Sequence, residues 1–296
     1  MEPRFTYRHS GLAVASALEL PEWDAFAQAC DRADVRVVIE EGPCPDCPAD
    51  GSAGVGEADV RFAIDGIGGW QVERGETIRL HPDAQAEPSE LRLFTLGSAW
   101  GALGYQRGFA MWHGSAVARE GRAILFCGDA GAGKSTMAAA LLARGAMLVA
   151  DDLSRVEPAG IHPSSARIKL WGPAIDLLGW RDRVLQRDYF RDDKFHCSVG
   201  LHAAGQKPLP LAGIVVLEEG ESLGVERLTG GAAMRAAMQG TIYRPEMLEA
   251  MGRWGEQGVL AAQIVAAAPV WRLTRPKSFA ALDEICAAAE RLWQQD

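Results

Sequence analysis

One eight-residue motif constrains this chain more than any other feature. Residues 128–135 read GDAGAGKS and match the pattern GxxxxGK[ST] fully. The apolar run 123–127 (AILFC) reads as a buried strand before it, and 135–143 reads as a helix after it. Such a loop turns backbone N–H groups inwards and adds the positive end of a helix dipole. The motif therefore predicts a phosphate-binding loop within an α/β domain.

The residue types of this loop predict how a nucleotide is held. Lys134 is expected to reach the β- and γ-phosphates and to act in catalysis, while the hydroxyl of Ser135 is expected on Mg²⁺. The nucleotide is ATP or GTP, although no guanine-reading NKxD motif is seen. The predicted nucleotide-binding residues are Gly128, Asp129, Ala130, Gly131, Ala132, Gly133, Lys134, Ser135 and Thr136.

Two adjacent carboxylates follow the next apolar segment. Residues 146–150 are expected to form a buried strand that ends in Asp151 and Asp152. A nucleotide site needs a carboxylate near the metal, and a kinase also needs a group that accepts or orients the proton of its acceptor hydroxyl. Because successive side chains on a strand diverge, the two aspartates could divide these tasks. The residues alone do not say which aspartate does which.

The rest of the chain predicts two domains. Residues 1–90 read as short strands and turns, which indicates a small N-terminal α+β domain, either structural or holding a peptide along a sheet edge. Residues 91–296 are assigned to the phosphate-loop domain, with a mainly parallel sheet flanked by helices. The apolar spacing over 88–108 predicts a helix that joins the two parts.

Composition excludes several classes of function. The net charge is −9 and no long basic run occurs, which disfavours nucleic acid and anionic membranes as partners. No apolar run approaches the roughly 20 residues of a membrane span, and the first residues lack a signal peptide's apolar core, so we expect a cytoplasmic protein. Cys44 and Cys47 have metal or redox spacing but stand alone among prolines, and we interpret them as two loop thiols.

The order of three motifs resembles a known family. His113-Gly114, then the phosphate loop, then Leu148-Val-Ala-Asp-Asp152 is similar to the catalytic domain of bacterial HPr kinase/phosphorylase, which phosphorylates a serine of a small carrier protein. The resemblance implies a mixed sheet flanked by helices. It implies that Asp151 is the base that takes the serine proton, that His113 is its neighbour and tunes it, and that Ser135 and Asp152 are the metal-side pair. That family assembles as hexamers, so a homo-oligomer is left open.

Segments further along the chain resemble one subgroup of related enzymes more than the HPr kinases themselves. The glycine- and arginine-rich signature that follows the acidic pair in HPr kinases is not seen, and IKLWGP (168–173) and GTIYRPE (240–246) stand further along. These segments, with the opening 7–21, resemble the HPr-kinase-related enzymes found beside lasso-peptide biosynthesis genes. Those kinases are thought to phosphorylate a serine at the C-terminus of a precursor peptide. The resemblance implies a peptide or small-protein partner that carries an acceptor serine.

Phosphoryl transfer spreads negative charge over three oxygens, so a cation is expected near the transfer point. Lys169, Lys194 and Arg244 are the candidates for such a substrate or transition-state contact, and each is equally well explained as a surface charge. His196 is expected to be a surface residue.

The sequence therefore favours an ATP-dependent serine kinase that uses Mg²⁺ and acts on a peptide, with the C-terminal serine of a lasso-peptide precursor as the acceptor. One alternative is an HPr(Ser) kinase/phosphorylase. An alternative of another class is a nucleotide-binding regulatory switch without a phosphoryl acceptor. A small-molecule kinase also stays open.

Overall fold

The chain is a mixed α/β protein of two compact units. The computed structural model describes residues 2–48, 52–56, 58–239 and 241–294, so Gly240 of the 240–246 segment lies outside the described residues. The first unit comprises Met1–Met111 and Tyr243–Gln257, and the second comprises Trp112–Ile242 and Gly258–Asp296. This division differs from the predicted boundary at residue 90.

A seven-stranded mixed sheet forms the first unit, in the order β1-β2-β3-β7-β6-β5-β4. β3 pairs in parallel with β2 and β7, and the other neighbours are antiparallel. The short strands and turns predicted for residues 1–90 are confirmed in the part of this range that the structure describes. A further hairpin, β1–β2, turns at Ser10 and Gly11, both with positive φ. The strands are β1 (Phe5–His9), β2 (Leu12–Ser16), β3 (Val35–Ile39), β4 (Gly54–Val55), β5 (Asp59–Ile64), β6 (Gly68–Glu73) and β7 (Thr77–Pro82).

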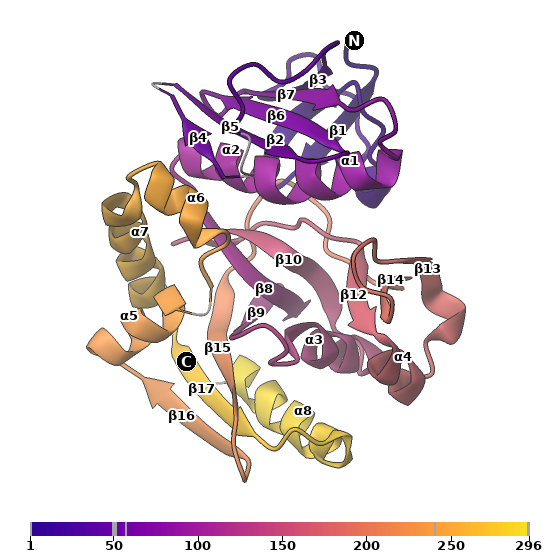
Figure 1. The fold of residues 1–296 in the computed structure, drawn as a ribbon. Coiled ribbons are helices and arrows are strands. Elements are labelled where there is room, and N and C mark those ends of the chain that lie inside the picture. Colours follow the sequence, from indigo (N-terminus) through magenta and orange to yellow (C-terminus); the bar gives the residue numbers. More distant parts are fainter. Residues whose placement is uncertain (1, 49–51, 57, 240, 295–296) are drawn as a thin grey trace. The chain divides into compact units, whose positions relative to one another are not determined.

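The helix predicted over 88–108 belongs to the first unit, which explains the shifted boundary. It runs as α1 (Pro88–Phe94), a π-helical segment (Thr95–Ala99) and α2 (Trp100–Gln106), and it packs on β6 and β7 (Figure 1). Trp70 of β6 is fully buried and its Nε1 donates to Thr95 Oγ1 at 2.9 Å. The unit also contains a 3₁₀ helix (Pro21–Phe26) and α6 (Pro245–Ala250), and α7 (Trp254–Ala267) begins in it and ends in the second unit.

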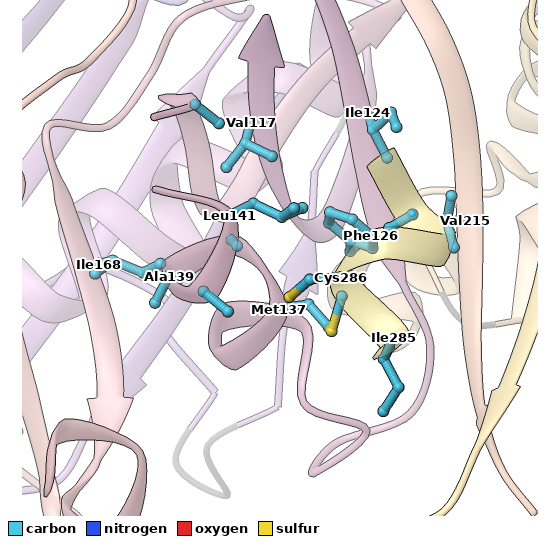
Figure 2. Packing of buried hydrophobic residues seen from close by; sticks show 14 of the residues in the cluster. Val117, Ile124, Phe126, Met137, Ala139, Leu141, Ile168, Val215, Ile285 and Cys286 are labelled. Atoms are coloured by element: carbon cyan, nitrogen blue, oxygen red, sulfur yellow. The ribbon is translucent and has the colours of Figure 1, made fainter. Parts of the chain in front are cut away.

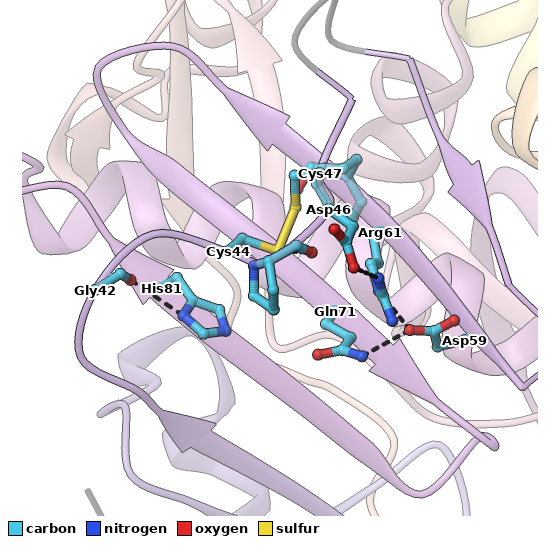
Figure 3. The surroundings of a disulfide bond; sticks show 10 residues. Gly42, Cys44, Asp46, Cys47, Asp59, Arg61, Gln71 and His81 are labelled. Carbon is cyan, nitrogen blue, oxygen red and sulfur yellow. Dashed lines mark hydrogen bonds and ion pairs between the residues drawn. A yellow bond between two sulfur atoms is a disulfide. The ribbon is translucent and has the colours of Figure 1, made fainter.

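The loop that follows β3 contains a covalent bond that the sequence analysis did not predict. Cys44 and Cys47 form a disulfide instead of the predicted pair of thiols (Figure 3). The loop packs closely on β6, since a Cβ at Gly69 would lie 2.2 Å from Cys44 Cβ. His81 Nδ1 donates to Gly42 O at 3.1 Å and holds the start of the same loop. The disulfide thus closes a loop that already rests against the sheet.

The second unit is built on another seven-stranded sheet, in the order β11-β10-β8-β9-β15-β17-β16. β9, β15 and β17 are parallel to one another, but β8 is antiparallel to β9 and β16 is antiparallel to β17. The sheet is therefore mixed, as the family resemblance implied, and not mainly parallel. β8 runs antiparallel to β9 for a local reason. The two-residue turn Glu120-Gly121 has positive φ at both positions and reverses the chain. The strands are β8 (Ala110–Arg119), β9 (Arg122–Cys127), β10 (Met147–Glu157), β11 (Gly160–Ile161), β15 (Leu211–Glu219), β16 (Gly224–Leu228) and β17 (Val270–Arg275).

A small antiparallel sheet, which was not predicted, completes the second unit. β12 (Arg167–Trp171) and β13 (Val184–Arg187) both pair with β14 (Lys194–Ser198). The helices of this unit are α3 (Lys134–Ala143), α4 (Gly172–Leu178), a 3₁₀ turn (Arg181–Arg183), α5 (Gly230–Gln239), a 3₁₀ turn (Phe279–Ala281), α8 (Leu282–Arg291) and a 3₁₀ turn (Leu292–Gln294). The helix predicted at 135–143 is therefore confirmed.

Helix α3 is fixed by the core of the second unit. Met137 and Leu141 of α3 are buried against Phe126 of β9, with Ile285 and Cys286 of α8 nearby (Figure 2). The alanines at 138–140 let the helix approach its neighbours closely, since they add little bulk. This packing sets the position and direction of the helix that begins at the phosphate loop.

β10 does not end where the sequence predicted. The strand continues through Asp151 and Asp152 to Glu157, so the two carboxylates lie in its middle. Asp152 has φ 73°, a left-handed conformation that is uncommon for a residue other than glycine. This residue interrupts the regular alternation of side chains along β10. Within the described residues, no helix combines the length and apolar character that a bilayer span requires.

Candidate active site

The phosphate loop connects β9 directly to α3. Cys127 is the last residue of β9 and Lys134 the first of α3. Gly133 precedes the helix with φ 86°, a conformation that glycine adopts without a steric cost. A Cβ at Gly128 would lie 2.7 Å from the carbonyl oxygen of Leu217 in β15, so this position requires glycine. The loop geometry therefore follows from the glycines that the motif specifies.

Lys134 lies inside the loop that precedes it. Its side chain is buried, and its Nζ donates to the carbonyl oxygens of Gly128 at 2.8 Å and Asp129 at 3.0 Å. Burial lowers the pKa of this ammonium. Within the described part of the chain it forms no ion pair, so carbonyl groups hold this buried cation without a paired anion, and Asp152 and Asp151 act on it only at longer range. Phosphate oxygens would supply that anion, and the loop therefore fits a nucleotide.

The hydroxyl of Ser135 belongs to a hydrogen-bonded group with one carboxylate. Ser135 Oγ donates to Asp151 Oδ1 at 2.9 Å, and Ser115 Oγ of β8 donates to the same oxygen at 2.6 Å. The other oxygen, Oδ2, accepts from the backbone N–H of Lys169 at 2.8 Å. Burial raises the pKa of Asp151, with the charge of Asp152 acting in the same direction and these three hydrogen bonds opposing both. A hydroxyl and a carboxylate together are a ligand pair that Mg²⁺ accepts.

Asp152 has a different set of neighbours. Its Oδ2 accepts from Lys169 Nζ at 2.8 Å, and its Oδ1 lies 3.4 Å from His113 Nε2. The Lys169 ammonium holds the pKa of Asp152 well below its usual value, and His113 acts in the same direction against burial. The side chain of Asp152 is 41% exposed, whereas that of Lys169 is 19% exposed. Asp152 is therefore an ionised carboxylate that solvent can reach.

These contacts differ from the pairing that the resemblance implied. His113 was expected beside Asp151, but it lies beside Asp152. Ser135 was expected to share the metal with Asp152, but it hydrogen-bonds to Asp151. The physical reason is the left-handed backbone at Asp152, which turns this carboxylate away from the loop-side position that Asp151 occupies.

The three predicted cations have different surroundings. Lys169 lies in the site and contacts both aspartates. Lys194 is half-buried, and its pKa is lowered by burial and by the neighbouring Lys169 and Arg191, with Asp152 acting in the opposite direction. Arg244 belongs to the first unit, where it pairs with Glu246 at 3.4 Å.

The expected surface position of His196 was wrong. Its side chain is only 13% exposed, and its Nε2 lies 4.0 Å from Oδ2 of the buried Asp188. His196 is directly opposite Lys169 in the β12–β14 pairing, which places it on the same face of the small sheet. His196 therefore lies beside Lys169 on the small sheet.

Two residues near the loop were missed by the sequence analysis. Ser115 stands two positions after His113, so strand alternation alone puts both side chains on one face of β8. Arg275 ends β17, and its Nη2 donates to the carbonyl oxygen of Ala132 within the loop. Its Nε is buried without a hydrogen-bond partner among the described residues. No local motif marks Arg275, because it is 143 positions from the residue that it contacts.

Known proteins that are similar to this chain add little functional information to the geometry of the site. No protein-family model matches the chain, and no curated protein sequence does. The solved structures that match include the HPr(Ser) kinase/phosphatase from Coxiella burnetii, with 14% identity over 63% of this chain and 99% of that one, and a TM-score of 0.29. A likeness at this level carries no argument, so the functional case rests on the residues of the site.

Proposed function

We propose that this protein is a phosphotransferase that moves the γ-phosphoryl group of ATP to the hydroxyl of a serine in a peptide. The observation that carries the proposal is the hydrogen bond between Ser135 of the phosphate loop and Asp151 of β10. Phosphate-loop enzymes use this combination of hydroxyl and carboxylate to hold the magnesium of a bound nucleotide. The exposed second carboxylate, Asp152, then supports transfer to an acceptor.

On the nucleotide side, Ser135 and Asp151 would hold Mg²⁺, which supplies charge neutralisation for the phosphates. Lys134 would exchange its carbonyl partners for phosphate oxygens. The backbone N–H groups of residues 128–135 would bind the remaining oxygens at the start of α3. In this assignment Asp151 serves the metal, contrary to the role that the resemblance implied.

On the acceptor side, Asp152 would orient the serine hydroxyl and take its proton. The serine oxygen would form a bond to the γ-phosphorus while the bond from that phosphorus to the β–γ bridging oxygen breaks, which leaves ADP. His113 and Lys169 flank Asp152 and keep its carboxylate ionised and directed. A low pKa suits this task, because the transition state is loose and the carboxylate mainly orients the hydroxyl until the transfer is advanced.

The narrower proposal concerns the acceptor. We propose the C-terminal serine of a lasso-peptide precursor, supported by the resemblance of segments 168–173 and 240–246. The full chain is to be incubated with ATP, Mg²⁺ and either a precursor peptide or purified HPr, and the masses of both acceptors measured. A gain of one phosphoryl group by the peptide alone is expected. A gain by HPr alone would point to the kinase/phosphorylase, and nucleotide binding without any modified acceptor would point to a regulatory switch.

A further inference from the structure

An exposed aromatic and cationic surface lies on the small sheet beside Asp152. We call it the Trp171 face, and it comprises Trp171, Arg191 and Lys194. Trp171 is 46% exposed, which is high for an indole at the end of a strand. The charged groups of Arg191 and Lys194 both lie 6.0 Å from the centre of its ring. Tyr189 and Phe190, which lie between β13 and β14, are also exposed, at 48% and 60%.

Strand pairing connects this face to the acceptor carboxylate. Trp171 is two residues beyond Lys169 on β12, so both side chains lie on the same face, about 7 Å apart along the strand. Lys194 is directly opposite Trp171 on β14, which puts it on that face as well. Lys169 donates to Asp152 at 2.8 Å. An extended acceptor with its serine at Asp152 would therefore place a residue one or two positions away over Trp171.

The two cations of this face differ from neighbouring arginines in their ion pairing. Among the residues that the structure describes, neither Arg191 nor Lys194 forms an ion pair. Neighbouring arginines behave differently: Arg187 pairs with Asp192 at 3.0 Å and Arg181 with Asp176 at 2.5 Å. In a chain of net charge −9, two adjacent cations without carboxylate partners favour a negatively charged occupant.

The chemistry of the surroundings decides the kind of occupant. A nucleic acid would bring a line of phosphates close to Asp152 and the exposed Asp192 and Asp193, which would repel it. A peptide with one acidic side chain next to an apolar one meets the two cations and the indole without that repulsion. We propose that the Trp171 face selects the acceptor of the transfer reaction: a peptide that carries an acidic and an apolar side chain within two residues of its serine. This inference rests on the proposed function.

The test uses the full chain with labelled ATP, Mg²⁺ and peptide libraries that share a central serine and vary one flanking position at a time. Wild type is expected to prefer Asp or Glu at one flanking position and an apolar residue at another. Arg191→Glu should lower the preference for the acidic position by about fivefold and shift it to Lys or Arg, since an exposed charge pair contributes up to about that factor. Trp171→Ala should remove the apolar preference.

Arg181→Glu is the matched control, because it reverses an arginine on the same unit that already has a carboxylate partner. It should leave both preferences unchanged. Nucleotide affinity, measured by calorimetry, should be equal in all variants. Label transfer by wild type without any preference for flanking residues would overturn this inference and leave the proposed kinase function standing. No label in any library, with nucleotide still bound, would instead overturn the proposed function.

Discussion

Exchanging each aspartate for asparagine separates their two roles. Asp151 accepts two hydroxyl hydrogen bonds on Oδ1 and one N–H on Oδ2. In Asp151→Asn the amide oxygen can keep the Lys169 N–H, while the amide nitrogen donates to the two hydroxyls, which can accept as well as donate. The fold should therefore persist, at a cost of about 1 kcal/mol for the lost charge assistance.

Asp151→Asn should act mainly by lowering the affinity for Mg²⁺. Losing an outer partner of a metal ligand costs about 10- to 100-fold in metal affinity, and losing an anionic ligand itself should cost at least that much. We expect the Mg²⁺ concentration for half-maximal transfer to rise about 100-fold. Asp152→Asn should leave that concentration unchanged and lower kcat by about 10²- to 10⁴-fold, the usual contribution of a group that handles the proton.

The assay is transfer to the acceptor at saturating ATP over a Mg²⁺ titration, with calorimetry of ATP binding in parallel. Asp176→Asn, an exposed carboxylate paired with Arg181, is the control and should match wild type. The reverse pattern would refute the reasoning: a shifted Mg²⁺ requirement in Asp152→Asn together with a pure loss of kcat in Asp151→Asn. That result would restore the assignment that the sequence resemblance implied.

Three further changes test other parts of the structure. Arg275→Ala removes the donor to the Ala132 carbonyl, so the Kd for ATP measured by calorimetry should rise about tenfold while the acceptor KM stays constant. Lys169→Met removes the cation that lowers the pKa of Asp152. That ionised form stabilises the fold above about pH 4, and the contribution decreases as pH falls towards the lowered pKa. The variant should therefore lose about 1 kcal/mol in urea unfolding at pH 7, and the loss should become smaller as the pH is lowered below about 4. Met137→Ala should lower stability by about 3 kcal/mol at any pH, since it opens a cavity beneath α3, and equal urea midpoints would contradict the packing in Figure 2.

The disulfide and the domain boundary show where local patterns were insufficient. Cys44 and Cys47 are three residues apart, and their spacing is equally compatible with thiols, a metal site or a bond. The helix over 88–108 was predicted from its apolar spacing, but the sheet it covers depends on contacts with β6 and β7 that no local pattern contains. Its assignment to the first unit therefore required the tertiary structure.

The sequence by itself determined the position of the glycine-rich loop 128–135 between a strand and a helix. A strand, three glycines with positive φ, a lysine and a serine at the start of a helix are local requirements, and Gly128 to Ser135 satisfy them within eight residues. The same is true of the helix that follows, which the structure confirms over Lys134–Ala143. These features depend on neighbours in the chain, so they can be read from the chain.

Tertiary structure alone decided which groups each carboxylate contacts. β10 continues through both aspartates, and the left-handed residue at Asp152 sets the direction of each side chain. Asp151 then meets two serines from β8 and α3, whereas Asp152 meets His113 and Lys169 from β8 and β12. Each of these partners is separated from the aspartates by at least sixteen residues. Their positions follow from strand pairing and core packing, which no spacing in the sequence specifies.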